Sequence, residues 1–243
     1  MKALLPYPTL AAIALLLLGT LQSCDRSGLI CVRGNGNLDT ESRLIGEYSA
    51  VASSGNFDIV IVQGAGGMAE IEAESNLLKH IETKVDRGTL QIGTVDNQCI
   101  NEQERIRIEL TVASLAGVLQ NGSGYIFCDS LSTTDFNAQI TGSGDVEMRV
   151  FANSLDASVA GSGNMTLRGT APTADLATTG SGPVDALDLH TQICDVRSRG
   201  SGNIWTHCDS LLDVTITGSG DVFYTGNPTI TERITGSGTL EIY

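Results

Sequence analysis

The feature that most constrains the fold is a short motif, Gly-Ser-Gly, that occurs seven times in the second half of the chain. The motif begins at residues 122, 142, 161, 180, 200, 218 and 236, so successive copies are 20, 19, 19, 20, 18 and 18 residues apart. Two copies extend to the identical heptapeptide ITGSGDV, at 140–146 and 216–222. Regular spacing at this period is typical of one structural unit stacked on itself.

Apolar and polar residues alternate on both sides of each copy. Four residues after the first glycine, every copy carries an apolar side chain: Ile126, Val146, Met165, Val184, Ile204, Val222 and Leu240. Two, four and six residues before it apolar residues are again favoured, as in Ile140, Ala138 and Phe136. This period of two predicts one β-strand that leads into each motif and one that leads out.

We therefore predict an all-β protein, with a parallel β-solenoid of about seven coils of 18–20 residues in residues 116–243. Successive coils would pair in parallel, about 4.8 Å apart. The glycines are expected to supply positive φ angles at a sharp corner, with the serines stacked from coil to coil. A sandwich of hairpins is the alternative, but hairpins reverse the chain and would not keep one motif in a constant phase.

Residues 30–115 lack this phase and are predicted to form an N-terminal β cap, or irregular coils, continuous with the solenoid. Strands are expected within 57–61, 69–74 and 105–112. A short helix is expected at 76–82, capped by Ser75 or Asn76, and a hairpin over 84–93 that turns at 86–88. No proline-rich linker separates this region from the repeats, which indicates one continuous core.

Residues 1–23 are predicted to be a lipoprotein signal peptide. The apolar run 10–18 follows Lys2 and is short for a membrane span. It leads to Leu21-Gln22-Ser23-Cys24, which resembles the bacterial lipoprotein cleavage box. The resemblance implies cleavage before Cys24, acylation of its thiol, a tether at 24–29 and a position in the cell envelope, at the outer membrane. A secretory signal followed by a chance cysteine is the alternative.

The remaining cysteines and the net charge limit which metals, cofactors and partners are expected. Export permits disulfides, and Cys31 and Cys99 lie in the region before the repeats, where they could pair. None of the cysteines forms a CxxC pair, so zinc is not expected, and no cofactor is predicted. A formal net charge of −14 argues against nucleic acid as a partner.

Two rows of side chains are candidate sites if the coils stack in register. Five residues before the first glycine stand Asp156, Asp175, Asp195 and Asp213, preceded by Asn137. Such a ladder could bind a cation such as Ca²⁺, which would relieve repulsion between the carboxylates. The favoured interpretation is a solvated row, screened by salt and by the nearby Arg197 and Arg233.

Five residues after the first glycine stand Phe127, Trp205 and Phe223, on the outward side of their strands. Exposed aromatic rings in this row could bind a glycan or a surface protein. The alternative is that another part of the chain covers them.

No catalytic residue is assigned, and the chain is not predicted to be an enzyme. It contains no HExxH, no GxSxG with partner residues and no P-loop. A polysaccharide-acting enzyme that uses the aspartate row with Arg197 or Arg199 is the least favoured alternative.

Three groups of residues together resemble one known family. They are Ser54-Gly55-Asn56-Phe57-Asp58-Ile59, the pattern NLL…IET…V..GTL…I from Asn76 to Ile92, and the repeated GSGDV and GSGN corners. In this order they are similar to the head GIN domain, which is named as the head of an auto-transporter adhesin and is common in envelope proteins of Bacteroidetes-type bacteria. The similarity covers about residues 30–240.

This resemblance implies a β-solenoid-like fold, export and a binding or adhesive role, and it supplies no catalytic residues. We accordingly predict a lipid-anchored envelope protein with a non-catalytic, adhesin-like role. Its expected partners are the membrane, through the lipid anchor, and a glycan or surface protein. The structural alternative is an envelope scaffold that self-associates through the solenoid ends.

Overall fold

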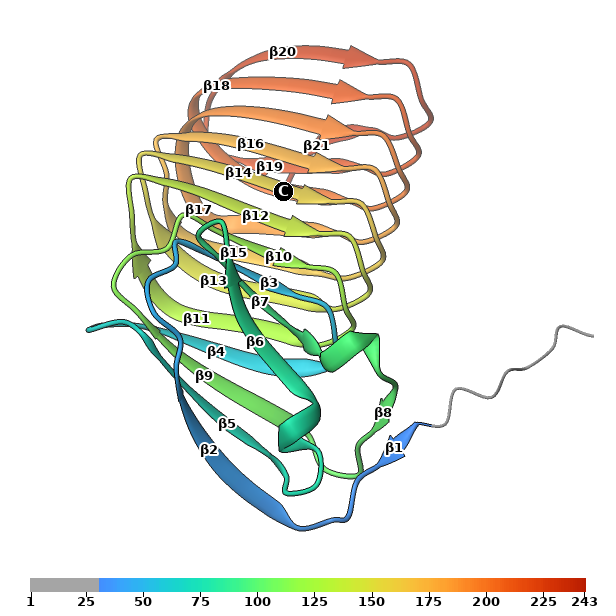
Figure 1. Cartoon of the computed structure of the whole chain (residues 1–243). Helices are drawn as coiled ribbons and strands as arrows, with labels where there is room; N and C mark the ends of the chain where they lie inside the picture. Colours follow the sequence, from blue (N-terminus) through green and yellow to red (C-terminus); the bar gives the residue numbers. More distant parts are fainter. Residues whose placement is uncertain (1–30) are drawn as a thin grey trace, which may run out of the picture. The chain divides into compact units, whose positions relative to one another are not determined.

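The computed structural model describes residues 31–243 and confirms the parallel β-solenoid (Figure 1). Residues Val32–Tyr243 form one compact unit. Each coil has an inbound strand, which leads to the Gly-Ser-Gly corner, and an outbound strand, which leaves it. Inbound strands pair in parallel with inbound strands, and outbound with outbound, so the stack has an inbound face and an outbound face. The predicted signal peptide and tether, with Cys24, lie outside the described residues.

The inbound strands, in order along the stack, are β7 (Thr89–Thr94), β3 (Ala50–Ser53), β10 (Gly117–Gln120), β12 (Asp135–Ile140), β14 (Ser154–Val159), β16 (Thr173–Thr178), the second halves of β17 (Val184–Ser198) and β18 (Ile204–Ile216), and β20 (Thr229–Ile234). The outbound strands are β9 (Ile106–Val112), β4 (Phe57–Gln63), β11 (Tyr125–Ser132), β13 (Asp145–Phe151), β15 (Met165–Thr170), the first halves of β17 and β18, β19 (Val222–Thr225) and β21 (Leu240–Ile242).

The core lies between the two faces and is built from the alternating apolar positions. Val146 pairs with Met165, and Met165 with Val184, each one coil further along. All three side chains are at most 1% exposed. The same holds for Ile140 and Val159 on the inbound side. Each coil thus places its apolar side chains over those of the previous coil, and the stack buries one continuous core.

The corner glycines have a different role from the predicted one. None of the glycines in the seven motifs has a positive φ angle. A Cβ atom on Gly161 would instead collide with the carbonyl oxygen of Gly142, and one on Gly200 with that of Gly180, at distances that Cβ atoms essentially never show. The prediction that these glycines supply left-handed turns is therefore wrong. The coils need glycine here because backbone approaches backbone.

Hydrogen bonds run from corner to corner along the stack. The carbonyl of Gly180 accepts bonds from the N–H groups of Ser201, at 2.9 Å, and Gly202, at 3.3 Å, and the carbonyl of Gly200 serves the next corner in the same way. The serine side chains of the motifs are exposed. The expected register of the motifs, one over another, is confirmed.

Carboxylates and amides beside the corners connect neighbouring coils. The side chain of Asp145 accepts a bond from the backbone N–H of Asn164, at 2.7 Å, and that of Asp221 from Thr239, at 2.8 Å. Asn203 bonds the N–H of Asp221 in the same way. Residues that follow Gly-Ser-Gly therefore hold coils together, in addition to suiting a turn.

The stack begins before the first Gly-Ser-Gly. Gly55 forms a corner directly beneath Gly122, and the coil made by β3 and β4 lies between the coil of β7 and β9 and the coil of β10 and β11. Strand order in space thus departs from chain order at this end. After β4 the chain forms the cap strands β5 (Met68–Glu74) and β6 (Ile81–Asp86). It then returns to the stack as β7 and β9, which pair with β3 and β4.

Antiparallel strands close the N-terminal end of the stack. β5 pairs with β9 and β2 (Leu38–Leu44) with β5, while β6 pairs with β7. The β6–β7 hairpin confirms the predicted turn, with positive φ at Arg87 and Gly88. Of the expected helix only a 3₁₀ turn forms, at Leu78–His80, and its N-cap is Leu77, without a side-chain cap. The remaining elements are β1 (Val32–Arg33), paired with β8 (Ile100–Asn101), and a second 3₁₀ turn, Val95–Asn97.

The C-terminal end of the stack is open. Among the described residues, no strand pairs with the outer edges of β20 and β21. Ile230 and Ile234 occupy inward positions but remain 37% and 38% exposed, because no further coil covers them. Glu232 lies between them, where the preceding coil has Val214. Within the described part of the chain, no helix is long and apolar enough to cross a membrane.

Candidate binding surfaces on the solenoid

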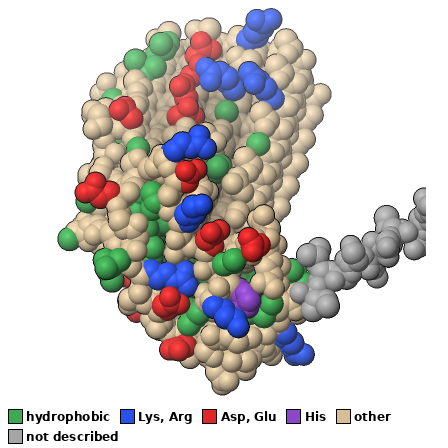
Figure 2. Space-filling model, in the orientation of Figure 1, with side chains coloured by type: hydrophobic (Ala, Val, Ile, Leu, Met, Phe, Trp, Pro, Cys, Tyr) green, Lys and Arg blue, Asp and Glu red, His purple; other side chains and the backbone are tan. Residues whose placement is uncertain are grey.

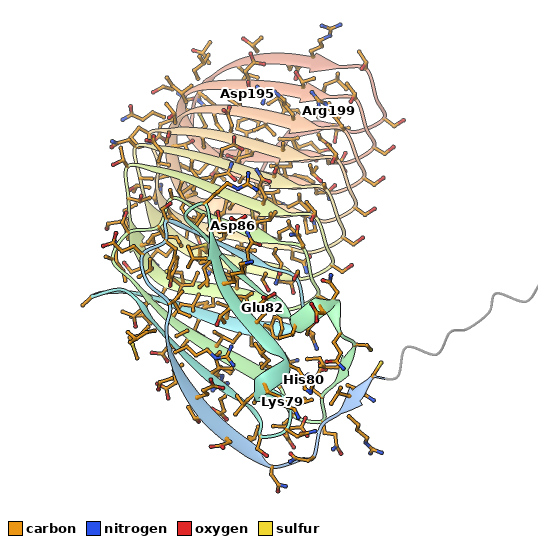
Figure 3. All side chains as sticks on the ribbon, viewed as in Figure 1. Lys79, His80, Glu82, Asp86, Asp195 and Arg199 are labelled. Atoms are coloured by element: carbon orange, nitrogen blue, oxygen red, sulfur yellow. The ribbon has the colours of Figure 1, made fainter. Side chains whose placement is uncertain are left out.

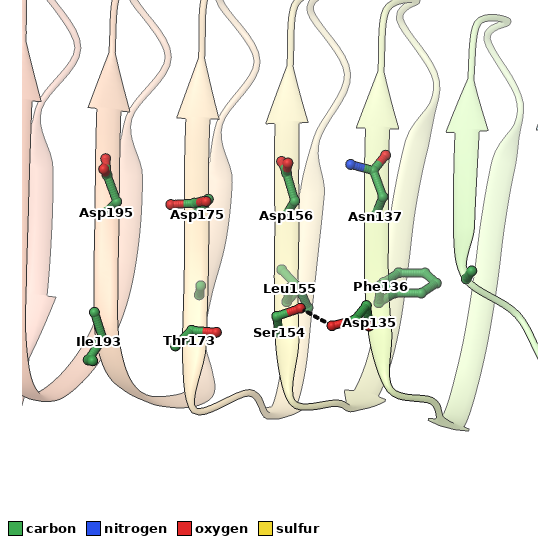
Figure 4. A pocket seen from close by; sticks show the side chains of 12 residues that line it. Asp135, Phe136, Asn137, Ser154, Leu155, Asp156, Thr173, Asp175, Ile193 and Asp195 are labelled. Carbon is green, nitrogen blue, oxygen red and sulfur yellow. Dashed lines mark hydrogen bonds between the residues drawn. The ribbon is translucent and has the colours of Figure 1, made fainter.

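The predicted aspartate row exists on the inbound face. Asp156, Asp175, Asp195 and Asp213 are paired residues of consecutive coils, and Asn137 continues the row beneath Asp156. Figure 4 shows the side chains from Asn137 to Asp195 side by side on neighbouring strands. A second row, from Asp135 to Ile193, runs parallel to it, and the hydroxyl of Ser154 donates a hydrogen bond to Asp135. The two rows line an open groove of about 460 Å³.

Burial and repulsion between neighbours perturb two of these carboxyl groups. Partial burial, and then the charge of Asp175, raise the pKa of Asp156 above its usual value. The pKa of Asp195 is also raised, by burial first and then by Asp175 and Asp213, although Arg197 opposes this shift. Arg197 forms an ion pair with Asp195.

Cation binding by this row stays a prediction. No group of three or more His, Cys, Asp or Glu side chains in residues 31–243 is arranged to hold a metal ion. Figure 2 shows acidic and basic side chains close together on this face, and Figure 3 places Arg199 on the same side of the stack as Asp195. Figure 3 also labels Lys79 and His80 on the 3₁₀ turn and Glu82 and Asp86 on β6. Asp156, Asp175 and Asp213 are exposed and Asp195 is partly exposed, so the row is a solvated acidic surface.

Two of the three predicted aromatic residues lie together on the outbound face. Trp205 and Phe223 are paired residues of neighbouring coils, and both are partly exposed. Their rings are stacked, with centroids 5.4 Å apart and planes inclined by 15°. Tyr243 meets Phe223 edge to face, at 6.4 Å, and is 71% exposed. We call these three residues the aromatic cluster.

Phe127 does not belong to the aromatic cluster. Its row continues through Glu147, Thr166 and Asp185 before it reaches Trp205. Four coil steps correspond to about 19 Å, at about 4.8 Å for each step. Phe127 instead stacks with Tyr125, at 6.2 Å.

A polar network separates the two groups of aromatic residues. The hydroxyl of Tyr125 donates a 2.6 Å hydrogen bond to Glu147, which also forms an ion pair with Arg168. These two hydrogen bonds hold the pKa of the Glu147 carboxyl below its usual value. Glu147 is thus an ionised surface group that stabilises two neighbouring coils.

Tyr243 was not predicted as part of a site. It lies seven residues after the first glycine of the last corner, two residues beyond Glu241, which the register pairs with Phe223. Its ring meets Phe223 diagonally, which the row five residues after the first glycine does not indicate.

The cysteines are divided between the core and the N-terminal region. Cys128, Cys194 and Cys208 are free and buried, and burial raises the pKa of Cys194 to about 12, which makes it unreactive near neutral pH. A bridge between Cys31 and Cys99 stays a prediction. Val32 and Ile100, the residues that directly follow them, pair in register in β1 and β8.

The fold and these surfaces define a class: a parallel β-solenoid with an antiparallel cap at one end and candidate binding surfaces on its faces. The chain belongs to the family described as "Putative auto-transporter adhesin, head GIN domain", whose model matches residues 47–228. The predicted family membership is confirmed. No curated protein gives a significant match.

Solved structures from Bacteroides and Parabacteroides species share this fold. The chain is similar to a putative adhesin from Bacteroides fragilis, with a TM-score of 0.83 and 24% identity over 87% of this chain and 100% of that one. It is also similar to a putative lipid binding protein from Parabacteroides distasonis, with a TM-score of 0.74 and 25% identity over 87% and 99%. A putative adhesin from Parabacteroides merdae has a TM-score of 0.68 and 21% identity over 87% and 98%.

The descriptions of the family and of these structures name adhesins and a lipid-binding protein, and none names an enzyme. The family to which the chain belongs is thus described as adhesin-type, a class of cell-surface and envelope proteins.

Proposed function

We propose that this chain is a lipid-anchored envelope adhesin that binds the sugar rings of a glycan through the aromatic cluster. One observation carries the proposal: Trp205 and Phe223 stack nearly parallel and remain partly exposed on the outward side of neighbouring coils. The two stacked rings cover each other's inner faces and leave an outer face and ring edges, apolar surfaces against which a sugar ring can pack. Tyr243 adds a phenolic hydroxyl at the rim, where it can hydrogen-bond sugar hydroxyl groups.

The rigidity of the platform supports a binding role. The two rings are carried by β18 and β19, which pair over four residues, and the side chains beneath them, Ile204 and Val222, are fully buried. Binding would therefore cost little ordering of the protein. The acidic surface, with a net charge of −14, favours neutral or amino-bearing glycans over strongly anionic ones.

Glycan-array binding of residues 25–243 tests this proposal. Trp205→Ala is expected to weaken binding at least tenfold, as expected for a central aromatic residue of a binding site. Phe127→Ala is the matched control, because Phe127 lies in the same row on the same face, four coils away. Equal loss with both variants, or no loss with Trp205→Ala, would rule out the aromatic cluster as the site.

The lipid anchor is a separate part of the proposal. Its support is the cleavage-box sequence that ends at Cys24. Cells that express the full chain should incorporate labelled palmitate into it, and Cys24→Ala should abolish the label. Protease treatment of intact cells then reports whether the body is exposed on the outside. Label that persists in the Cys24→Ala variant would refute acylation at this thiol.

End-to-end association is a second candidate function, and the open C-terminal end favours it. Within the described residues, strands β20 and β21 present unpaired edges, and Ile242 in β21 is 71% exposed. Unpaired strands of this kind can pair with another chain. Sedimentation at increasing protein concentration would show larger species if the ends associate, and a constant monomer mass would reject this candidate.

A further inference from the structure

The basic side chains of the outbound strands gather in one place on the outbound face. Strands β11, β13, β15, β19 and β21 and the first halves of β17 and β18 contain only four Lys, Arg or His residues: Arg149, Arg168, His190 and His207. They come from four consecutive coils. Arg149 pairs in register with Arg168, and His190 with His207. On a chain with a net charge of −14, this group is a local departure from the acidic surface.

Arg149 is the arginine of this group without a partner. Its neighbour Arg168 forms ion pairs with Glu147 and, at 3.7 Å, with Asp188, so the charge of Arg168 is compensated. Among residues 31–243 the guanidinium of Arg149 makes no ion pair and no hydrogen bond, and the side chain is exposed. A guanidinium presents N–H donors in a planar arrangement that matches the two oxygens of a carboxylate. Arg149 is therefore suited to bind an anion.

His190 is the second basic residue with free polar atoms. His207 is held in place, because Thr225 at 2.9 Å and Asp209 at 3.2 Å contact its two ring nitrogens. The ring of His190 meets that of His207 edge to face, with centroids 4.8 Å apart. The ring nitrogens of His190 have no hydrogen bond within the described part of the chain, and the residue is exposed. His190 is thus positioned by its neighbour, while its nitrogens stay available to a ligand.

A β-bulge brings His190 into the same row as Phe151. Phe151 pairs with Thr170, and Thr170 pairs with His190, so these three side chains form one row across three coils. Between Thr166 and Gly169 the register of β15 against β17 shifts, because β17 carries one extra residue there. Without this residue the buried Leu189 would stand opposite Thr170. Bulges commonly redirect a side chain beside a functional site.

Arg149 and His190 line the same hollow, whose volume of about 310 Å³ is within the range of small-molecule sites. The other residues that line it are Phe151, Arg168, Gly169, Thr170 and Asp188. Phe151 follows Arg149 by two residues on β13 and is 39% exposed, so its ring offers apolar surface beside the guanidinium. A second hollow, of about 340 Å³, shares Thr170 and His190 with the first. We call the two hollows together the Arg149 groove.

We propose that the Arg149 groove binds an acidic sugar unit, a pyranose ring that carries one carboxylate. The carboxylate accepts hydrogen bonds from Arg149 and His190, and the apolar face of the sugar ring packs on Phe151. Thr170 supplies a hydroxyl for the hydroxyl groups of the ring. A small inorganic anion would use Arg149 but would leave the Phe151 ring in water.

The second hollow indicates that the acidic unit belongs to a longer saccharide. Its size is close to that of the first, and Gln192 and Asp209 line it, so it suits an adjoining neutral unit that hydrogen-bonds through its hydroxyl groups. Because the rest of the surface is acidic, a saccharide with a carboxylate on one unit fits better than one charged at every unit. The groove is lined by different residues from the aromatic cluster, and the inference does not depend on the proposed glycan binding.

NMR titration with monosaccharides tests this assignment. Residues 25–243 serve as the protein, because the compact unit Val32–Tyr243 contains all the described strands. The probes are the methyl glycosides of glucuronic and galacturonic acid, each compared with the neutral glucoside or galactoside. At least one uronoside should bind at least tenfold more tightly than its neutral counterpart, as expected for a charge-assisted hydrogen bond. Cyclohexanecarboxylate, which has the ring and the charge without hydroxyl groups, should bind at least threefold more weakly than that uronoside.

Arg149→Gln separates binding from folding. It should weaken uronoside binding at least tenfold, to the level of the neutral sugar. Its denaturation midpoint should match that of the wild type, because the side chain is exposed and has no partner to lose. Arg199→Gln is the matched control: it makes the same change of charge at an exposed arginine beside the Gly200 corner and should leave uronoside binding unchanged.

Phe151→Ala tests the contact with the sugar ring. It should weaken uronoside binding at least threefold, while Trp205→Ala should bind the uronoside normally. The proposal is overturned if neither uronoside binds the wild type, if the neutral sugar or cyclohexanecarboxylate binds as tightly, or if Arg149→Gln or Phe151→Ala retains full binding. Equal loss in Arg199→Gln would reveal a long-range effect of charge, and loss in Trp205→Ala would assign the binding to the aromatic cluster; either result also overturns it.

Discussion

Replacement of one corner glycine by alanine tests why the repeat contains glycine at all. In Gly200→Ala the new Cβ would meet the carbonyl oxygen of Gly180 closer than the 3.0 Å limit for real Cβ atoms. The coils must therefore separate locally by roughly 1 Å to relieve the overlap. Separation breaks the two bonds that this carbonyl accepts, from Ser201 and Gly202.

The expected loss follows from these contacts. Two backbone hydrogen bonds contribute about 2 kcal/mol to the free energy of unfolding, and overpacking adds about 1–3 kcal/mol. Gly200→Ala should thus destabilise the protein by about 3–5 kcal/mol. The measurement is denaturant unfolding followed by the fluorescence of Trp205, the single tryptophan, which lies five residues after the mutated corner.

Two control variants isolate the cause. Ser201→Ala changes an exposed side chain of the same corner and should alter stability by less than about 0.5 kcal/mol. Gly46→Ala introduces a Cβ into open space at a φ of +83°, so it should cost about 1–2 kcal/mol through backbone strain alone. If Gly200→Ala costs no more than Gly46→Ala, close approach between coils is not the reason for the regular spacing of glycines in this repeat.

Three further predictions concern the two ends of the stack. Burial alone would raise the pKa of the Glu74 carboxyl, but hydrogen bonds from the N–H groups of Gln103, Gly36 and Glu104 outweigh burial and lower this pKa. The ionised carboxylate therefore stabilises the fold above its unfolded pKa of about 4.3, and this stabilisation is lost as the pH falls through the folded pKa. Glu74→Gln should therefore lower the denaturation midpoint at pH 7, and the difference from the wild type should narrow below about pH 4; a constant difference would contradict this reasoning. A bridge between Cys31 and Cys99 would stabilise the protein by about 4 kcal/mol through loop closure, so non-reduced peptide mapping should find the linked pair and reduction should lower the midpoint. Glu232→Val, which restores the apolar residue of the preceding coil, should promote concentration-dependent association in sedimentation experiments beyond that of the wild type, whereas unchanged mass would show that this charge does not protect the edge.

The solenoid itself could be predicted because the spacing of the Gly-Ser-Gly motifs gives its period directly. A motif in constant phase, with apolar residues at even offsets such as Ile140 and Val146, requires parallel coils in register. The same counting predicts that Trp205 and Phe223 are neighbours. It also implies that Phe127 lies four coils from Trp205, so the sequence alone was enough to separate Phe127 from Trp205 and Phe223.

Other features depend on distances and strand order that a period does not contain. The role of the corner glycines appears only when one coil is placed over the next. The corner at Gly55 carries a single glycine, so it does not match the repeat, although it forms a coil. The placement of β9 between β4 and β5 departs from chain order.

At every step from Gly122 to Gly236, the carbonyl of the first corner glycine accepts a backbone hydrogen bond from the next corner, and this repetition leaves the length of the stack unspecified. Each coil adds about 4.8 Å to the axis and offers its successor the surface on which it was itself built. Insertion or removal of a whole coil would therefore change the reach of the molecule from its capped end without redesign of the core. A family built in this way can adjust how far it projects by duplicating about nineteen residues at a time.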